Sequence, residues 1–220
     1  MKILFFIYIF LHLLHADTKK IYFYTTDINI NNFKSLKINF DTYLSKYGHY
    51  EFQPFNNKET FETQLKNRNS VVILSSWHYL EIAKKYNLEA TLVAQKKASI
   101  VDTKILVGKK DIKLQGLVTS AYNKEYTNEL LTSLTKEDIN NLSILIVPKE
   151  IDALMSVGFG MSKFALVSKE SFTLLEEINP FLAKSLKIYS ESDPKYRMVL
   201  APYDIDIQKA NLSLSSKRWD

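Results

Sequence analysis

The segment from Asn69 to Gln95, NSVVILSSWHYLEIAKKYNLEATLVAQ, decides the predicted fold of this chain. It begins with Val71-Val72-Ile73-Leu74, a continuous apolar run typical of a strand that is buried on both faces. After Ser75-Ser76 the apolar residues follow helical spacing as far as Tyr86, and residues 90–94 have the composition of a second strand. A strand, a helix and a strand in succession favour a parallel sheet.

The strand-to-helix turn of this unit is the first candidate binding site. Open α/β sheets usually bind ligands at the carboxyl ends of their strands, which is where this turn lies. A serine hydroxyl at a helix start can also serve only to cap the helix, and that structural interpretation stays open. The side chains that the turn would bring together are Ser75, Ser76, Trp77, His78 and Tyr79.

Composition restricts the possible classes of protein. The chain has 220 residues, enough for one domain or two small lobes, and its 46% hydrophobic content is that of a globular protein. Its formal net charge is +5, but the basic residues are dispersed, which argues against a nucleic-acid surface. The sequence contains no cysteine, so disulfides, thiol catalysis and cysteine metal sites are excluded.

The N-terminus has the pattern of a secretory signal peptide. Lys2 is followed by an apolar run and then by His15-Ala16-Asp17, and we expect cleavage after Ala16. The alternative is a membrane anchor, but the apolar run is shorter than the roughly 20 residues that a membrane-spanning helix needs. The sequence therefore predicts export to the periplasm.

The remainder of the chain alternates between strand and helix patterns, and the alternation restarts after Lys110. This indicates two α/β lobes, lobe I formed by residues 17–98 and 199–220 and lobe II by residues 99–198. The other strands are expected at 20–25, 50–55, 105–108, 114–118, 142–147, 164–167, 186–189 and 197–201, and the other helices at 32–47, 57–65, 123–134, 149–157 and 168–178.

The same segments resemble a known family, the periplasmic solute-binding proteins of phosphate/phosphonate-type ABC transporters. The similarity covers residues 20–202 and rests on IYFYTTD, NNKETFETQLKN, VVILSSWHYLEIAKKY, LVTSAY and GMSKFALV, among other segments. Ser75-Ser76 replaces the Gly-Pro of the family, Ala121 replaces a glycine, and Lys163 stands where the family often has an aspartate. These departures lie near the expected cleft, so the ligand class stays open.

The resemblance implies a type 2 periplasmic-binding-protein fold with two lobes, each a small, mostly parallel sheet flanked by helices. It implies a monomer that captures a small ligand between its lobes, with a phosphonate- or phosphate-like anion as one candidate. The monomer delivers this ligand to an ABC permease, without a cofactor and without catalysis. The alternative is a ligand-sensing protein that signals to a membrane receptor. A secreted hydrolase is a third class, but the sequence has no nucleophile elbow and no metal-site spacing.

The expected ligand site combines three strand ends. Thr119 and Ser120 precede a predicted helix and offer hydroxyl and N–H groups to an anion, as Ser75 and Ser76 do in the other lobe. Simple helix capping is the alternative in both places. Lys163 is either an anion partner or a solvated lysine. Together with the turn of lobe I, the expected site residues are Tyr24, Thr25, Thr119, Ser120, Tyr122 and Lys163.

Overall fold

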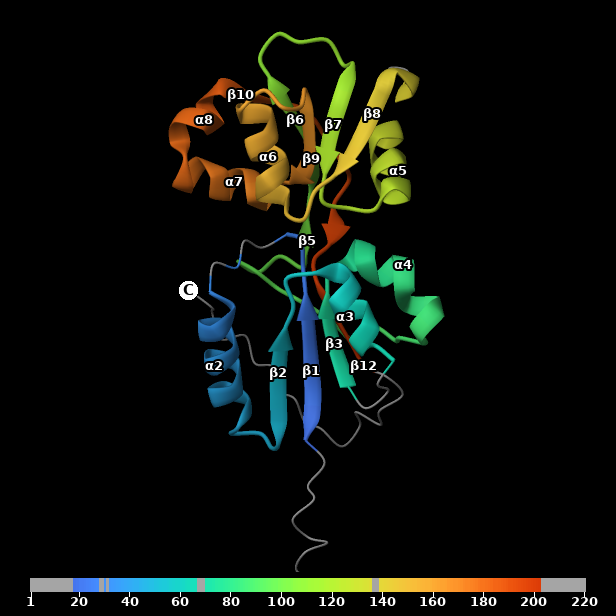
Figure 1. Cartoon of the computed structure of the whole chain (residues 1–220), viewed down its shortest axis with the longest axis vertical. Coiled ribbons are helices and arrows are strands. Elements are labelled where there is room, and N and C mark those ends of the chain that lie inside the picture. Colours follow the sequence, from blue (N-terminus) through green and yellow to red (C-terminus); the bar gives the residue numbers. More distant parts are fainter. Residues whose placement is uncertain (1–17, 28–29, 31, 67–69, 136–138, 203–220) are drawn as a thin grey trace, which may run out of the picture.

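The chain forms two lobes, one above the other in Figure 1. The structure is a computed structural model, and it describes residues 18–27, 30, 32–66, 70–135 and 139–202. The expected signal peptide, residues 1–16, lies outside the described residues. Among the helices that are described, none combines the length and the apolar character needed to span a bilayer.

The lower lobe contains a five-stranded sheet in the order β2-β1-β3-β12-β4. β12 pairs antiparallel with both β3 and β4, so these two strands run in the same direction but are not neighbours. The sheet is therefore mostly parallel, as expected, although a strand from the C-terminal part of the chain separates β3 from β4. The strands are β1 (Lys19–Tyr24), β2 (Tyr50–Pro54), β3 (Ser70–Leu74), β4 (Leu92–Val93) and β12 (Val199–Pro202).

Three helices flank this sheet, α2 (Phe33–Leu44), α3 (Lys58–Gln64) and α4 (Ser76–Tyr86). α3 begins where Asn57 accepts a hydrogen bond from the N–H of Thr60, which satisfies a first-turn donor. α4 ends at Asn87, whose φ of 51° is the left-handed conformation that asparagine tolerates.

The upper lobe has the same arrangement, with the strand order β10-β6-β9-β7-β8. β6 is antiparallel to both of its neighbours, and the other four strands share one direction. In each lobe the reversed strand is the one that arrives from the other lobe. The strands are β6 (Lys104–Lys109), β7 (Gly116–Ser120), β8 (Leu142–Ile146), β9 (Phe164–Ser168) and β10 (Leu186–Glu191), and the helices are α5 (Lys124–Leu134), α6 (Glu150–Gly158), α7 (Lys169–Ile178) and α8 (Pro180–Ser185), with a 3-10 turn at Ile139–Asn141.

The upper lobe differs from the sequence expectations in two places. β7 begins and ends two residues later than the expected strand at 114–118, so Thr119 and Ser120 are strand residues and do not directly precede the helix. The cap of α5 is Asn123, which accepts from the N–H of Tyr126. α8 was not expected; Pro180 occupies its first turn, and Asn179 caps it.

The described chain passes between the sheets twice, between β4 and β6 and between β10 and β12. At the crossing, β5 (Val101–Asp102) pairs antiparallel with β11 (Lys195–Tyr196). The expected lobe boundaries stay a prediction, but the two segments that join the sheets are held together as one small ladder. Glu170 on α7 forms ion pairs with Lys96 and Arg197, one from each joining segment.

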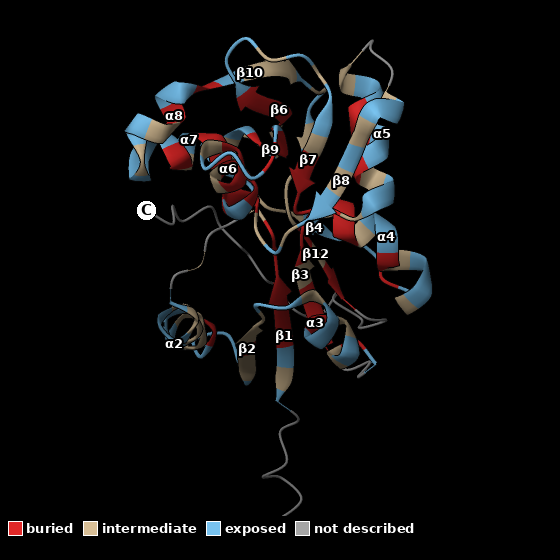
Figure 2. Cartoon of the chain, turned by 45° about the horizontal axis from the view of Figure 1, so that its top comes forward, coloured by how far each residue is buried: buried red, intermediate tan, exposed pale blue. Residues whose placement is uncertain are grey.

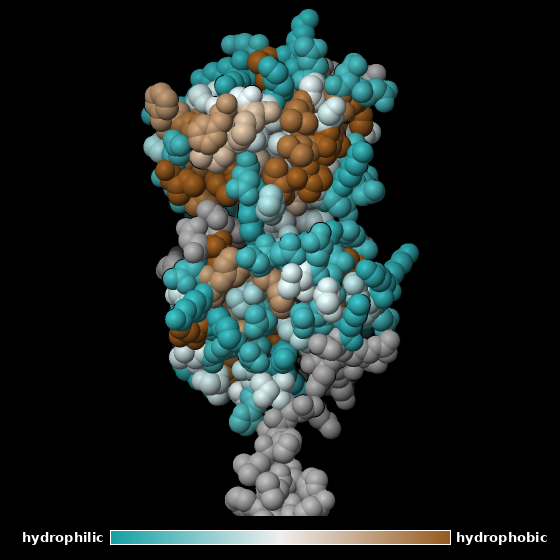
Figure 3. Space-filling view, viewed as in Figure 1, coloured by the Kyte–Doolittle hydropathy of each residue, from teal (hydrophilic) through white to brown (hydrophobic). Residues whose placement is uncertain are grey.

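Buried residues form the centre of each lobe and also reach the junction between them (Figure 2). Trp77 of α4 belongs to the lower lobe, yet it packs in an apolar cluster with Leu106, Tyr122 and Leu131 of the upper lobe. On the face seen in Figure 3 the larger apolar area lies on the upper lobe, and exposed Leu145 and Ile146 lie on its edge strand β8. The lobes are thus packed directly against each other.

Candidate functional site between the lobes

A cavity of about 280 Å³ lies between the two lobes. Its lower wall comes from the end of β1, the β2–α3 loop and the first turns of α3 and α4, and its upper wall from the β7–α5 and β8–α6 loops. All of these segments lie at carboxyl ends of strands, where parallel sheets present side chains to a crevice. The lining residues are Tyr24, Asn56, Asn57, Lys58, Glu59, Trp77, Ala121, Tyr122, Asn123, Ile146, Val147 and Pro148.

The polar groups of this wall include several hydrogen-bond donors beside one carboxylate, that of Glu59. The side-chain oxygens of Asn57 and Asn123 already accept from the first-turn N–H groups of α3 and α5, at 2.8 and 2.7 Å. Their NH₂ groups therefore remain as donors for a ligand. Burial, followed by the charge of Asp27, raises the pKa of the Tyr24 hydroxyl to about 12, so this group is a protonated O–H.

The three aromatic rings of the wall each lie beside a lysine of the protein. The ammonium nitrogens of Lys58, Lys104 and Lys149 lie 5.4, 4.9 and 5.4 Å from the ring centres of Trp77, Tyr122 and Tyr24, respectively. Lys58 is also bound to both carboxylate oxygens of Glu81, at 2.8 and 2.7 Å. The positive charge of Lys58 is therefore already neutralised, although this lysine lines the cavity.

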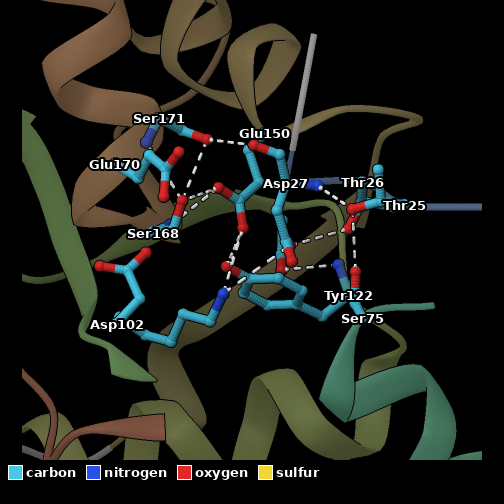
Figure 4. A network of polar contacts seen from close by, with 12 residues as sticks. Thr25, Thr26, Asp27, Ser75, Asp102, Tyr122, Glu150, Ser168, Glu170 and Ser171 are labelled. Carbon is cyan, nitrogen blue, oxygen red and sulfur yellow. Dashed lines mark hydrogen bonds and ion pairs between the residues drawn. The ribbon is translucent and has the colours of Figure 1, made fainter. Parts of the chain in front are cut away.

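A buried polar network lies beside the cavity (Figure 4). Its centre is Glu150, the first residue of α6, whose side chain is fully buried. One carboxylate oxygen accepts from the N–H of Ser168 at 2.9 Å and from the Ser168 hydroxyl. The other accepts from the Tyr122 hydroxyl and lies 3.5 Å from the ammonium of Lys104. Glu150 thus receives hydrogen bonds from the amino end of α7, as a bound anion would.

The network continues into the lower lobe through Asp27, which follows β1. An Asp27 carboxylate oxygen lies 3.7 Å from the Lys104 ammonium, so Lys104 stands between two carboxylates. Burial raises the pKa of Asp27 to about 6, despite the opposing charge of Lys104. Burial would also raise the pKa of Glu150, but Lys104 and the hydrogen bonds to this carboxylate outweigh burial and hold that pKa below its usual value. The two carboxylates therefore differ in their preferred charge states.

The residues expected at the turn of α4 point in different directions. Trp77 lines the cavity. Ser75 makes no helix-capping bond with its hydroxyl, which instead lies 3.1 Å from the hydroxyl of Thr25 in a buried pair. The Ser76 hydroxyl donates to the carbonyl of Tyr196 in β11, so it contacts the joining segments rather than the cavity.

Two further residues of this turn pack inside the lower lobe. Nε2 of His78 lies 3.0 Å from a Glu62 carboxylate oxygen, and the ring is fully buried. The Tyr79 hydroxyl donates to the carbonyl of Leu88 and accepts from the N–H of Ala90. Neither His78 nor Tyr79 lines the cavity.

The expected residues of the upper lobe are also divided. Tyr122 lines the cavity, as Tyr24 does from below. The Thr119 hydroxyl is buried under α6, 2.9 Å from that of Ser156, and Ser120 accepts from the N–H of Tyr122 at 3.2 Å. Lys163 precedes β9, at the opposite end of the sheet from the cavity, because β9 and β7 are parallel.

The sequence interpretation missed the asparagines of the wall and the buried network. Asn57 and Asn123 follow the same rule as Ser75, a capping residue at a helix that begins after a strand, so that pattern could have identified them. Asp27, Lys104 and Glu150 come from distant segments and carry no shared local signal. The described part of the chain holds no cluster of three or more histidine, aspartate or glutamate side chains suited to a metal ion.

No protein-family model and no curated protein sequence matches this chain. Several solved structures, in contrast, are similar to it. The binding protein component of an ABC phosphonate transporter from Pseudomonas aeruginosa is 14% identical with a TM-score of 0.62, covering 88% of this chain and 72% of that one. A histidine kinase sensor domain with similarity to periplasmic binding proteins is 14% identical with a TM-score of 0.57, covering 87% and 83%.

An enzyme is also among the similar structures. The ATP phosphoribosyl transferase complex from Thermotoga maritima is 13% identical with a TM-score of 0.56, covering 87% of this chain and 90% of that one. Other similar structures are binding proteins or a sensor domain. The resemblance seen in the sequence is confirmed at the level of architecture: the chain has the type 2 periplasmic-binding-protein fold.

Proposed function

We propose that this protein is a non-catalytic binding protein that holds a small solute in the cavity between its lobes. The observation that carries the proposal is the shared wall, in which Tyr24 and Trp77 come from the lower lobe and Tyr122 and Asn123 from the upper one. A solute in this position contacts both lobes only when they are together. Its binding free energy therefore favours the closed arrangement over an open one.

The wall favours a solute with hydrogen-bond-acceptor oxygens on a flat or apolar body. Tyr24, Trp77 and Tyr122 supply aromatic surface, and Val147 and Pro148 supply apolar surface. The NH₂ groups of the capping asparagines supply donors, because their oxygens point to the first-turn N–H groups of α3 and α5. A monocarboxylate or an amide attached to a ring combines these properties.

A doubly charged phosphonate fits this wall less well. Among the described lining residues the one cation is Lys58, and its charge is bound to Glu81. The amino end of α7, a second place where an anion could bind, is occupied by the carboxylate of Glu150. The phosphonate-like solute expected from the sequence is therefore the weaker candidate within the proposed class.

Catalysis by a serine–histidine pair has no support at this site. The Ser75 hydroxyl is bonded to Thr25, and His78 is bonded to Glu62 inside the lower lobe. A nucleophile must lie within hydrogen-bond reach of its base, and these side chains have other partners.

We infer that the protein acts in the periplasm as a monomer, after removal of residues 1–16. Delivery of the solute to an ABC permease is the first candidate role, and signalling to a membrane receptor is the second. The similar structures include both a transporter component and a sensor domain, and they favour neither role over the other.

Calorimetric titration with four probes tests the site: benzoate, nicotinamide, methylphosphonate and inorganic phosphate. We expect benzoate or nicotinamide to bind more tightly than either phosphorus compound. Asn57→Asp and Asn123→Asp keep a capping oxygen but replace the NH₂ donor by an acceptor, so each should weaken benzoate binding about tenfold or more. Asn128→Asp, at an exposed position of α5, is the control. Unchanged affinity in both wall variants would place the site elsewhere.

A further inference from the structure

We propose that Asp27, Lys104 and Glu150 form an intramolecular latch that keeps the two lobes closed without a solute. The latch is built from the end of β1 in the lower lobe and from β6 and the amino end of α6 in the upper lobe. The closing contacts are supplied by the protein itself.

Four contacts cross between the lobes within three consecutive residues. The carbonyl of Thr25 accepts from the ammonium of Lys149 at 2.7 Å, and the carbonyl of Thr26 accepts from the N–H of Glu150 at 3.2 Å. The carbonyl of Asp27 accepts from the hydroxyl of Ser171 at 3.1 Å, and its carboxylate pairs with Lys104 at 3.7 Å. The end of β1 is therefore bonded to β6, α6 and α7 together.

The Glu150 carboxylate binds the amino end of α7 in this junction, as an anionic ligand binds the start of a helix. Its carboxylate receives the N–H and hydroxyl of Ser168 and the hydroxyl of Tyr122, and its own N–H holds the lower lobe through Thr26. A charge-assisted hydrogen bond is about twice as strong as a neutral one. The anion that stabilises the amino end of α7 is covalently part of the upper lobe, so it does not have to be captured from solution.

Opening of the lobes would break the contacts of the latch. Lys104 is 5% exposed and Glu150 is fully buried, so neither charge is compensated by water in the closed state. Separation of the lobes would remove Asp27 from Lys104 and Thr26 from the N–H of Glu150, so the ion pair and the hydrogen bonds between the lobes would be lost together. Because a solute must first find an open form, its apparent affinity is reduced by the fraction of molecules that are open.

Distance measurement between two spin labels tests the latch in the full chain. The sequence has no cysteine, so labels on Thr63→Cys in α3 and Asn128→Cys in α5 report only on these exposed positions of facing lobes. Without any added solute, we expect one population at the distance that the closed structure gives. Lys104→Met in the labelled background removes the ion pair with Asp27 of the lower lobe and should add a longer-distance population. The control Glu176→Gln, at an exposed position of α7, should not.

The outcomes separate this proposal from the proposed function. A broad or long distance distribution of the unmodified labelled chain would overturn the latch, and so would a Lys104→Met distribution equal to that of the control. If Lys104→Met does not fold, Lys149→Met, which removes the bond to Thr25 from a half-buried position, decides the question by the same criterion. No solute is added, so failure of the four probes to bind would leave this result intact.

Discussion

Replacement of Asp27 by asparagine should stabilise the protein more at high pH than at low pH. Burial raises the pKa of this carboxyl from 3.8 to about 6, so the folded state holds the proton more tightly than the unfolded state does. Pairing with Lys104 offsets part, but not all, of the cost of burying the ionised carboxylate. Stability is therefore lower above about pH 6, and this loss is relieved as the pH falls from about 6 towards 3.8. Asparagine never ionises and lacks this pH dependence.

The size of the effect follows from the two pKa values. With 3.8 in the unfolded state and about 6 in the folded state, proton uptake by Asp27 should add about 2 kcal/mol to wild-type stability between about pH 8 and about pH 4.5. The stability of Asp27→Asn relative to wild type should therefore be about 2 kcal/mol more favourable at the higher pH. Contacts that the amide itself gains or loses cancel in this difference.

Urea unfolding at both pH values measures these free energies. Asp152→Asn is the control, because Asp152 is exposed on α6 and its carboxylate already contacts water. If the stability difference between wild type and Asp27→Asn is the same at both pH values, or larger in the opposite direction, the raised pKa that follows from the partial burial of Asp27 between the lobes is refuted.

Two further variants should show how the junction is stabilised. Glu150→Gln should lower the free energy of unfolding at neutral pH by about 3–5 kcal/mol, because it removes one partner of a buried ion pair. Since the pKa of Glu150 is lowered, this loss of stability should shrink as the pH falls. Urea unfolding measures it, and a loss that does not change with pH would contradict the prediction. Trp77→Ala should cost about 3–5 kcal/mol by the same measurement, because the ring is 3% exposed in the cluster shared by the lobes, and a loss below about 1 kcal/mol would contradict that packing.

Local patterns predicted the elements of this fold well, because the signals that define them lie within a few residues. The apolar run at Val71 is β3, and Asn87 ends α4 in the left-handed conformation that its short polar side chain permits. The insertion of β12 beside β3 was beyond such patterns. That pairing joins residues more than 120 positions apart, and it is set by the packing of whole lobes.

The candidate site was predicted less completely, for geometric reasons. Consecutive residues of a helix point about 100° apart, so Trp77, His78 and Tyr79 could not all face one cavity. Consecutive residues of a strand point to opposite faces, which is why Thr119 lies under α6 while Ser120 turns to the other side. The buried charges of the latch had no sequence signal, since a lysine and two acidic residues become a unit only after folding.

The central claim is that the cavity between the lobes binds a solute. Fluorine NMR at Trp77 tests this claim most directly. The chain has two tryptophans, so 5-fluorotryptophan gives two resonances, and Trp219→Phe assigns the one from Trp77. Titration with benzoate or nicotinamide should shift the Trp77 resonance until it saturates, and Asn57→Asp and Asn123→Asp should move the midpoint to higher concentration. A probe that binds by calorimetry but leaves the Trp77 resonance unchanged would contradict the account.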